Sequence, residues 1–301
     1  MVELSLTGVD SIKYFEFANF VFAVSDELIK RSTDLAIGLE KFFINKPKLI
    51  DFLLVTEDKM PNDSEKELLF GISECTYPTF AYRFNSGDYE FQFQEPNGQS
   101  GLTFYISKEW SKIILMEDDT SDNGYMLFNR IGALINLAVL NYNACVFHGV
   151  VMEYRENGIL VMASAGTGKT THTDMWENRE KALIINGDRC LCRCIDGVWY
   201  AFGMPWAGSS GKVLNRKVQI HTIVMLERNQ NNYVERISTF NAELCLLQRM
   251  FAPVSKGNLQ EKAFEYAHDI TAKIPVLRLM CRPDYESVDV LKKAIQDQQV
   301  K

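Results

Sequence analysis

Residues 159–170 read ILVMASAGTGKT, and this stretch determines the expected fold of the second half of the chain. Its first four residues are apolar, which is typical of a buried strand. The remaining eight, residues 163–170, differ from the phosphate-binding pattern G-x-x-x-x-G-K-[ST] only at the first position, where Ala163 replaces a glycine. We therefore expect a strand that leads through a phosphate-binding loop into a helix.

The residue types of this loop suit a nucleoside triphosphate. Gly166 and Gly168 allow successive backbone N–H groups to surround a phosphate at the positive end of the following helix. Lys169 is predicted to neutralise the β- and γ-phosphates, and the Thr170 hydroxyl to ligate magnesium. The alternative is a glycine-rich turn that binds nothing. The expected nucleotide-binding residues, with ATP and Mg²⁺ as cofactors, are Ser164, Ala165, Gly166, Thr167, Gly168, Lys169, Thr170 and Thr171.

Phosphoryl transfer also needs a carboxylate near the magnesium ion and a group that accepts the hydroxyl proton. An apolar stretch at 182–186 is followed by Gly187 and Asp188, which makes Asp188 the candidate metal ligand, general base, or both. His148 lies on an expected strand at 146–154, where its imidazole would orient Asp188 or the acceptor hydroxyl. The alternatives are an ordinary Asn-Gly-Asp turn and a core histidine bonded to the backbone. The predicted catalytic residues are Asp188, His148 and Lys169.

Three further cations are candidates for contact with substrate or phosphate. Lys212 ends a polar glycine-serine segment that would cover the nucleotide or meet the acceptor, and the alternative is an exposed connection. Arg278 and Arg282 lie four residues apart, so on a strand they share a face and would supply positive charge to the transferred phosphoryl group. Surface ion pairs are the commoner role of such arginines. His172 is expected to be exposed in the first turn of the helix.

The composition describes a globular protein with its own core, since 47% of the residues are hydrophobic and 24% are charged. A net charge of −7 argues against a nucleic-acid partner, which requires a basic surface. The first residues lack the basic-then-apolar pattern of a secretory signal. The apolar stretch 125–145 contains an arginine and several asparagines, so we expect a core helix and no membrane partner. Seven scattered cysteines favour reduced thiols and a cytoplasmic location.

Two domains are expected, with an α/β fold class of α+β character. Residues 1–120 predict a mostly β domain with two amphipathic helices, including strands at 14–24 and 50–56 and a hairpin over 80–93. The acidic segment 117–124 is the predicted boundary. Residues 121–301 are expected to form the nucleotide-binding domain, a mixed sheet with helices. The role of the first domain stays open between scaffold, dimer contact and substrate presentation.

The order of these motifs resembles that of the HPr kinase/phosphorylase catalytic domain and of its relative, ATP-dependent phosphoenolpyruvate carboxykinase. A strand with His148 and Gly149, the loop 163–170, and a strand that ends at Asp188 follow one another as in those families. Residues 164–172, SAGTGKTTH, are similar to the carboxykinase-type loop. Residues 200–208, YAFGMPWAG, resemble a PW-x-G segment of uncharacterised HPr-kinase-like bacterial proteins. The resemblance covers roughly residues 145–283.

The resemblance implies a P-loop catalytic domain in which Lys169 and Thr170 hold phosphate and magnesium. Asp188 matches the second member of an Asp-Asp pair, His148 matches a strand histidine, and Gly187 stands where the first acid would be. The implied function is a magnesium-dependent kinase that transfers the γ-phosphoryl group of ATP to a hydroxyl acceptor, which is a serine of a small protein or peptide or a small metabolite. A non-catalytic ATP-binding regulator and a carboxykinase-like enzyme are the alternatives. Relatives often assemble, so a homo-oligomer is compatible with the resemblance.

Overall fold

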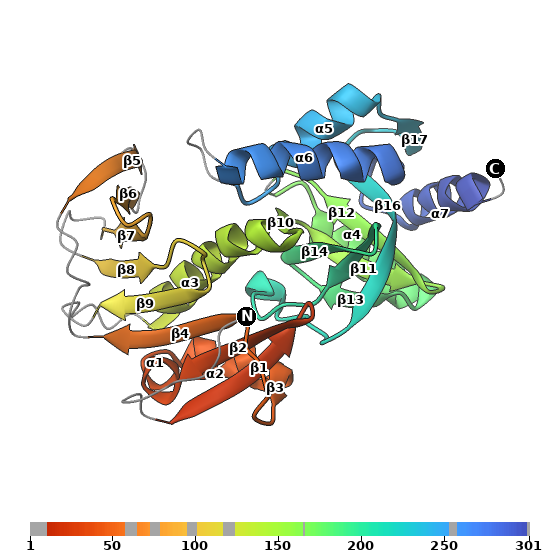
Figure 1. Ribbon diagram of the computed structural model, residues 1–301. Coiled ribbons are helices and arrows are strands. Elements are labelled where there is room, and N and C mark those ends of the chain that lie inside the picture. The colour runs from red at the N-terminus through yellow and green to blue at the C-terminus, as the bar shows by residue number, and fades with distance from the viewer. Residues whose placement is uncertain are drawn as a thin grey trace. The chain divides into compact units, whose positions relative to one another are not determined.

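The computed structural model describes residues 11–57, 65–72, 79–94, 101–116, 124–164, 166–252 and 258–299. The chain divides into two compact units, Met1–Asn141 with Val254–Lys256, and Tyr142–Pro253 with Gly257–Lys301. Each unit has its own mixed sheet and helices (Figure 1), which confirms the predicted mixed α/β class. The predicted domain boundary at 120/121 and its acidic segment 117–123 lie outside the described residues.

The first unit is built on a mixed sheet whose described strands follow the order β3-β1-β2-β4-β9-β8-β7-β6-β5. Strands β2, β4 and β9 run parallel to one another, and the remaining pairs are antiparallel. Its strands are β1 Ile12–Phe17, β2 Phe20–Ser25, β3 Phe43–Ile44, β4 Phe52–Glu57, β5 Lys66–Ile72, β6 Thr79–Phe84, β7 Tyr89–Phe93, β8 Leu102–Ile106 and β9 Lys112–Met116, and its helices are α1 Asp26–Lys30, α2 Thr33–Leu39 and α3 Gly124–Ala138.

The single strand expected over 14–24 is wrong, because this stretch forms the hairpin of β1 and β2. Ala18 and Asn19 join the two strands with φ angles of 55° and 57°. Two consecutive left-handed residues are the signature of a type I′ turn, which matches the twist of the strands on either side. Alanine seldom adopts a left-handed conformation, so Ala18 gave no turn signal in the sequence. The aromatic residues on both sides therefore predicted one uninterrupted strand. The hairpin expected over 80–93 is confirmed by β6 and β7.

The second unit holds the phosphate loop. Its described strands follow the order β10-β14-β15-β16-β12-β11-β13, and β18 pairs with β16 and β17. Strands β12, β16 and β18 run parallel, so their carboxyl ends share one edge of the sheet. Its strands are β10 Ala144–His148, β11 Val150–Tyr154, β12 Asn157–Met162, β13 Leu183–Asn186, β14 Arg189–Ile195, β15 Val198–Phe202, β16 Lys217–Arg228, β17 Tyr233–Arg236 and β18 Val276–Cys281, and its helices are α4 Lys169–Glu180, α5 Thr239–Leu247, α6 Asn258–Lys273 and α7 Tyr285–Gln299.

The strand expected over 146–154 is also interrupted. It forms β10, which pairs with β14, and β11, which pairs with β12 and β13, with Gly149 between them. A Cβ on Gly149 would lie 2.9 Å from the carbonyl oxygen of Val161, so only glycine lets the chain pass this close to β12. This break leaves His148 at the end of β10, beside the turn that carries Asp188.

The core that supports the loop lies between the parallel strands and two helices, α4 and α7. Trp176 of α4 is completely buried there, beside Val161 of β12 and Leu291 of α7. Helix α6 contacts the antiparallel part of the sheet. Asp269 of α6 accepts a hydrogen bond of 2.7 Å from the indole of Trp199 in β15. The core holds β12 and α4 rigidly together, which fixes the position of the loop between them.

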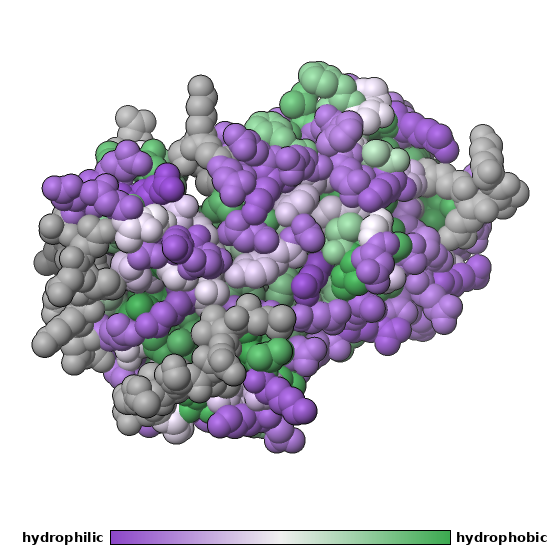
Figure 2. Space-filling model, viewed as in Figure 1, coloured by the Kyte–Doolittle hydropathy of each residue, from purple (hydrophilic) through white to green (hydrophobic). Residues whose placement is uncertain are grey.

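The outer surface of α5 and α6 shows apolar side chains of Phe240, Leu244 and Phe264, and part of this hydrophobic surface is visible over α5 in Figure 2. In the first unit, α3 is the predicted core helix and buries Leu127, Ile131 and Leu134. Within the described ranges, we find no helix with the length and apolar character needed to cross a membrane.

Candidate functional site

The two glycines of the loop between β12 and α4 adopt backbone angles that other residues rarely adopt. Gly166 has a φ of 72° and Gly168 a φ of 114°, both in the region that favours glycine. A Cβ on either residue would meet no heavy atom within 4 Å, so this side of the loop is open. The first hydrogen bond of α4 runs from His172 N to Gly168 O at 3.0 Å, and the amides before it in the helix have no helical acceptor. These amides form a site suited to an anion.

Ala163, which replaces the first glycine of the motif, is buried and does not appear among the described residues with positive φ. Its Cβ therefore causes no left-handed strain in the loop. Ala165, predicted to contact the nucleotide, lies outside the described residues. Ser164, Thr170 and Thr171 are exposed around the open side of the loop.

Lys169, His148 and Asp188 form one continuous polar chain beside the loop. The Lys169 ammonium nitrogen lies 3.2 Å from His148 Nε2 and 3.3 Å from the Ala163 carbonyl oxygen. On the other side of the ring, His148 Nδ1 lies 3.4 Å from Asp188 Oδ1. An ammonium group only donates, so Nε2 accepts and Nδ1 carries the proton that faces the carboxylate. The structure thus brings the three predicted catalytic residues together.

Electrostatics favours this arrangement with a neutral imidazole. Burial is the main cause that lowers the pKa of His148 below 6.5, and the nearby Lys169 charge lowers it further, while Asp188 opposes the shift. Burial likewise lowers the pKa of Lys169, again with Asp188 opposing and Arg249 adding to the shift. A neutral imidazole accepts a proton at one nitrogen and donates one from the other, so His148 can relay a proton between Lys169 and Asp188.

The direction of the Asp188 side chain is set by the buried residue Asn186. The Asn186 amide nitrogen donates to Met204 O at 2.8 Å, and its oxygen accepts from the backbone N–H groups of Asp188 and Arg189, each at 3.0 Å. An asparagine side chain that accepts from the backbone N–H groups two and three residues later is typical of a tight turn. Asn186 to Asp188 is therefore a turn, as the alternative interpretation holds, and it also places Asp188 beside His148.

Two glycines lie close to Asp188. A Cβ on Gly187 would lie 2.0 Å from the Ser210 hydroxyl oxygen, so a side chain there would require that hydroxyl to move. A Cβ on Gly208, whose φ is +59°, would lie 2.7 Å from the Cβ and Cγ atoms of Asp188. Gly208 of the PW-x-G segment is therefore required for the backbone to approach the carboxyl group.

Lys212 connects the segment after Trp206 to the helix of the phosphate loop. Its ammonium nitrogen lies 2.7 Å from Asp174 Oδ1 and 2.6 Å from Glu177 Oε2 on α4, and these two hydrogen bonds raise its pKa. Its carbonyl oxygen accepts a 3.1 Å bond from Gly187 N. The predicted contact of Lys212 with substrate or phosphate stays a prediction. Its observed contacts connect helix α4 to the turn that carries Asp188.

Arg228 was missed by the sequence reasoning and supports the loop directly. It is the last residue of β16, the parallel neighbour of β12. Its guanidinium donates to the carbonyl oxygens of Gly166 and Thr167, with the Thr167 bond at 3.1 Å. These bonds hold the carbonyl groups of Gly166 and Thr167 toward Arg228. The carbonyl oxygens therefore point away from the side of the loop where a phosphate would bind. An arginine at the carboxyl end of a parallel strand is a signal that the sequence contained.

Arg249, also missed, brings a second positive charge to the loop. Its guanidinium lies 3.4 Å from the Ser164 hydroxyl, and its carbonyl oxygen accepts a 2.8 Å bond from His148 N. The charge of Arg249 contributes to lowering the pKa values of both His148 and Lys169. Arg249 follows α5 without any motif, so only the tertiary structure reveals it.

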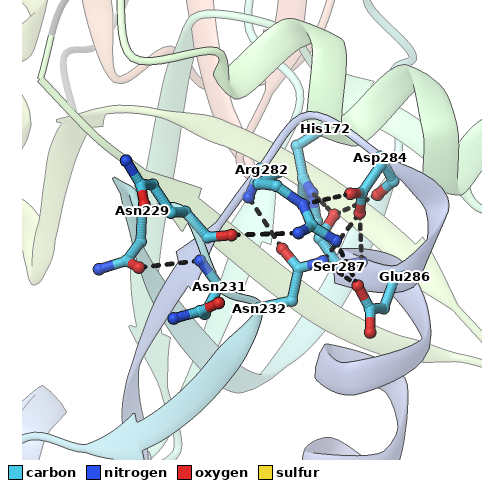
Figure 3. Close-up of polar contacts among 9 residues, drawn as sticks. His172, Asn229, Asn231, Asn232, Arg282, Asp284, Glu286 and Ser287 are labelled. Carbon is cyan, nitrogen blue, oxygen red and sulfur yellow. Dashed lines mark hydrogen bonds and ion pairs between the residues drawn. The ribbon is translucent and has the colours of Figure 1, made fainter.

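Arg282 belongs to a polar network at the same sheet edge (Figure 3). Its guanidinium donates to Asp284 Oδ2 at 2.8 Å and to Glu286 Oε2 at 2.6 Å, and its backbone N donates to Asn232 Oδ1 at 2.8 Å. The network connects the turn after β16 to the start of α7. Arg278 lies apart from the three-residue chain and pairs with Glu227 and Glu235. Contact of either arginine with phosphate stays a prediction.

The expectation that His172 is exposed is wrong. Its side chain is 2% exposed, accepts a 3.1 Å bond from the Trp176 indole at Nε2, and lies 3.2 Å from the Ser287 hydroxyl at Nδ1. Ser287 in turn donates to Asp284 O at 2.6 Å. His172 therefore connects the first turn of α4 to α7 in a neutral form, and burial lowers its pKa to about 4.

The residues present fit a triphosphate with magnesium. The open amides and the cations Lys169 and Arg249 suit the phosphates, while the exposed Thr170 and the carboxylate of Asp188 suit the metal. Among the described residues, no group of three or more His, Cys, Asp and Glu side chains could hold a metal ion.

No family model and no curated protein matches this chain. Among solved structures, the chain is similar to the HPr(Ser) kinase/phosphatase from Coxiella burnetii, with 10% sequence identity and a TM-score of 0.32. The match covers 52% of this chain and 90% of the other. The similarity is distant, and it assigns no activity, substrate or residue role to this chain.

Proposed function

We propose that this protein binds ATP with Mg²⁺ at residues 163–171 and transfers the γ-phosphoryl group to a hydroxyl acceptor. The observation that carries the proposal is the chain of Lys169, His148 and Asp188 at the open side of a loop with phosphate-binding geometry. A turn that bound nothing would have no need for a half-buried ammonium, an imidazole and a carboxylate in line beside it.

Each residue has a role that follows from its position. The amides at the start of α4 and the Lys169 ammonium bind the phosphates, and Arg249 compensates charge on the terminal phosphoryl group. Thr170 and Asp188 would hold Mg²⁺, which neutralises negative charge on the phosphates when bound. Asp188 accepts the proton of the attacking hydroxyl, and His148, which donates from Nδ1, orients the carboxylate.

A non-catalytic ATP-binding regulator is the second candidate, and one observation favours it. Residue 187 is a glycine where the resemblance leads one to expect an acid, and the Ser210 hydroxyl lies at its side-chain position, so a single carboxylate would serve both the metal and the proton. The two candidates differ in one measurable property. Both predict nucleotide binding, and only the kinase predicts γ-phosphoryl transfer.

Binding is tested by thermal unfolding with ATP and Mg²⁺. Ligand at 100 times its dissociation constant should stabilise the fold by about 2.7 kcal/mol. Lys169→Ala should remove most of this stabilisation, whereas Lys293→Ala, at an exposed position of α7, should keep it. The absence of stabilisation in the wild-type protein with any nucleoside triphosphate would refute both candidates.

Transfer is tested with Asp188→Asn, in panels of peptide and small-molecule hydroxyl acceptors. Loss of a general base lowers turnover by about 10²- to 10⁴-fold while binding persists. Asp196→Asn, in the exposed turn between β14 and β15, is the matched control. Full activity of the Asp188→Asn variant would remove Asp188 from the mechanism, and binding without turnover on any acceptor would favour the regulator.

A further inference from the structure

The segment 207–213 contains Gly208, which packs against Asp188, the carboxylate proposed as general base. Gly208 is so close that a Cβ would lie 2.7 Å from two Asp188 side-chain carbons, and it starts a short 3-10 turn, Gly208–Ser210. Gly208 and Gly211, at the ends of this turn, have φ angles of +59° and +60°. The backbone is thus folded tightly onto the carboxyl group.

This segment is held at several points. Lys212 binds Asp174 and Glu177 of α4 through its ammonium group, and its carbonyl oxygen accepts from Gly187 N. Val213 forms an antiparallel bridge with Asn186. These contacts secure the turn on two sides, one beside the helix of the phosphate loop and one beside the Asp188 turn.

The two serines of the turn differ in their contacts. Ser210 donates to Ala207 O at 2.8 Å and accepts from Lys212 N at 3.3 Å, so its hydroxyl is used inside the turn. Ser209 is exposed and directly follows the glycine that packs against Asp188. No hydrogen bond of the Ser209 hydroxyl is recorded within the described part of the chain. Ser209 is therefore an exposed hydroxyl next in sequence to the glycine that contacts the proposed base.

We propose that Ser209 is a site of self-phosphorylation, in which the turn Gly208–Ser210 presents an internal hydroxyl to Asp188 and the bound nucleotide. In this step the Ser209 oxygen forms a bond to the γ-phosphorus, the bond between that phosphorus and the β–γ bridging oxygen breaks, and ADP leaves. The hydroxyl proton passes to Asp188. The inference rests on the proposed function and adds the acceptor class, a serine on a glycine-flanked turn.

A phosphate on Ser209 would have a direct effect on the site. It would add about two negative charges at pH 7 next to the Asp188 carboxylate and the ion pairs of Lys212. Like charges repel, so the turn would be displaced from Asp188 and the position beside the base would open. Phosphorylation of Ser209 thus uses up the internal hydroxyl acceptor and allows the hydroxyl of another molecule to approach Asp188.

The test incubates the purified full chain with ATP and Mg²⁺ and locates phosphate by tandem mass spectrometry. Wild type should carry phosphate on Ser209, Ser209→Ala should carry none there, and Ser209→Thr should regain it on the threonine. Ser210→Ala, at the hydroxyl already used in the turn, should retain modification of Ser209. The initial rate per molecule should not change on dilution, as expected for transfer within one chain.

Nucleotide binding, measured by thermal shift on the same samples, distinguishes a failure of Ser209 phosphorylation from a failure of the proposed function. Binding with turnover on another acceptor but no phosphate on Ser209 would overturn this inference and leave the proposed function standing. Absence of binding would overturn the proposed function itself. Phosphate on Ser209 that persists in Lys169→Ala would show that another kinase added it, which also overturns the inference.

Discussion

Acid should destabilise this protein through one buried histidine, His172. Burial lowers the pKa of this ring from 6.5 to about 4, and its two nitrogens face the Trp176 indole and the Ser287 hydroxyl. A protonated ring could not accept from the indole, so the native structure favours the neutral form. Between these two pKa values the unfolded chain binds more protons than the folded one, and the stability falls as the pH falls.

The magnitude follows from the size of the shift. A displacement from 6.5 to about 4, at about 1.36 kcal/mol for each pKa unit, corresponds to about 3 kcal/mol. This contribution is fully present above pH 6.5 and is lost progressively toward pH 4. It is a large part of the total stability of an ordinary domain, which is about 5–15 kcal/mol.

Urea unfolding at several pH values, followed by the fluorescence of the buried tryptophans, measures the effect. His172→Gln keeps an acceptor for the indole and a donor for Ser287 but has no proton to gain. Its free energy of unfolding should therefore fall by about 3 kcal/mol less than that of wild type between pH 6.5 and 4. His221→Gln, at an exposed ring of β16, should behave like wild type. Equal losses in His172→Gln and wild type would refute the reasoning.

Two further predictions concern the groups around Asp188 and the loop. Gly208→Ala would place a Cβ 2.7 Å from the Asp188 side chain, so turnover should fall at least tenfold while ATP-induced stabilisation persists. Gly211→Ala, with a similar positive φ but open space around its Cβ, is the control, and equal turnover in both variants would contradict a role for the Asp188 contact. Arg249→Gln should lower turnover by about 10²-fold if its charge acts on the terminal phosphoryl group, as measured in steady-state kinetics. Arg179→Gln, whose charge pairs with Asp289, should not, and a normal rate for Arg249→Gln would exclude this role.

The sequence by itself determined the strand, loop and helix around residues 163–170, because glycine conformation, helix start and strand hydrophobicity are local properties. It also predicted the mixed α/β class and the hairpin over 80–93. Asp188 and His148 were identified as candidates because chemistry demanded a carboxylate and a base near the loop. Their residue types and order along the chain were sufficient for that hypothesis.

Only the tertiary structure decided which groups meet. Arg249 reaches Ser164 across 85 residues of sequence, and such a contact depends on how β10 and the end of α5 pack. The exposure of His172 was misjudged because Ser287, its partner on α7, comes 115 residues later. The Ser210 hydroxyl lies where a side chain at position 187 would begin, a contact between residues 23 positions apart in the sequence. Long-range packing fixes these distances, and local sequence patterns carry no information about them.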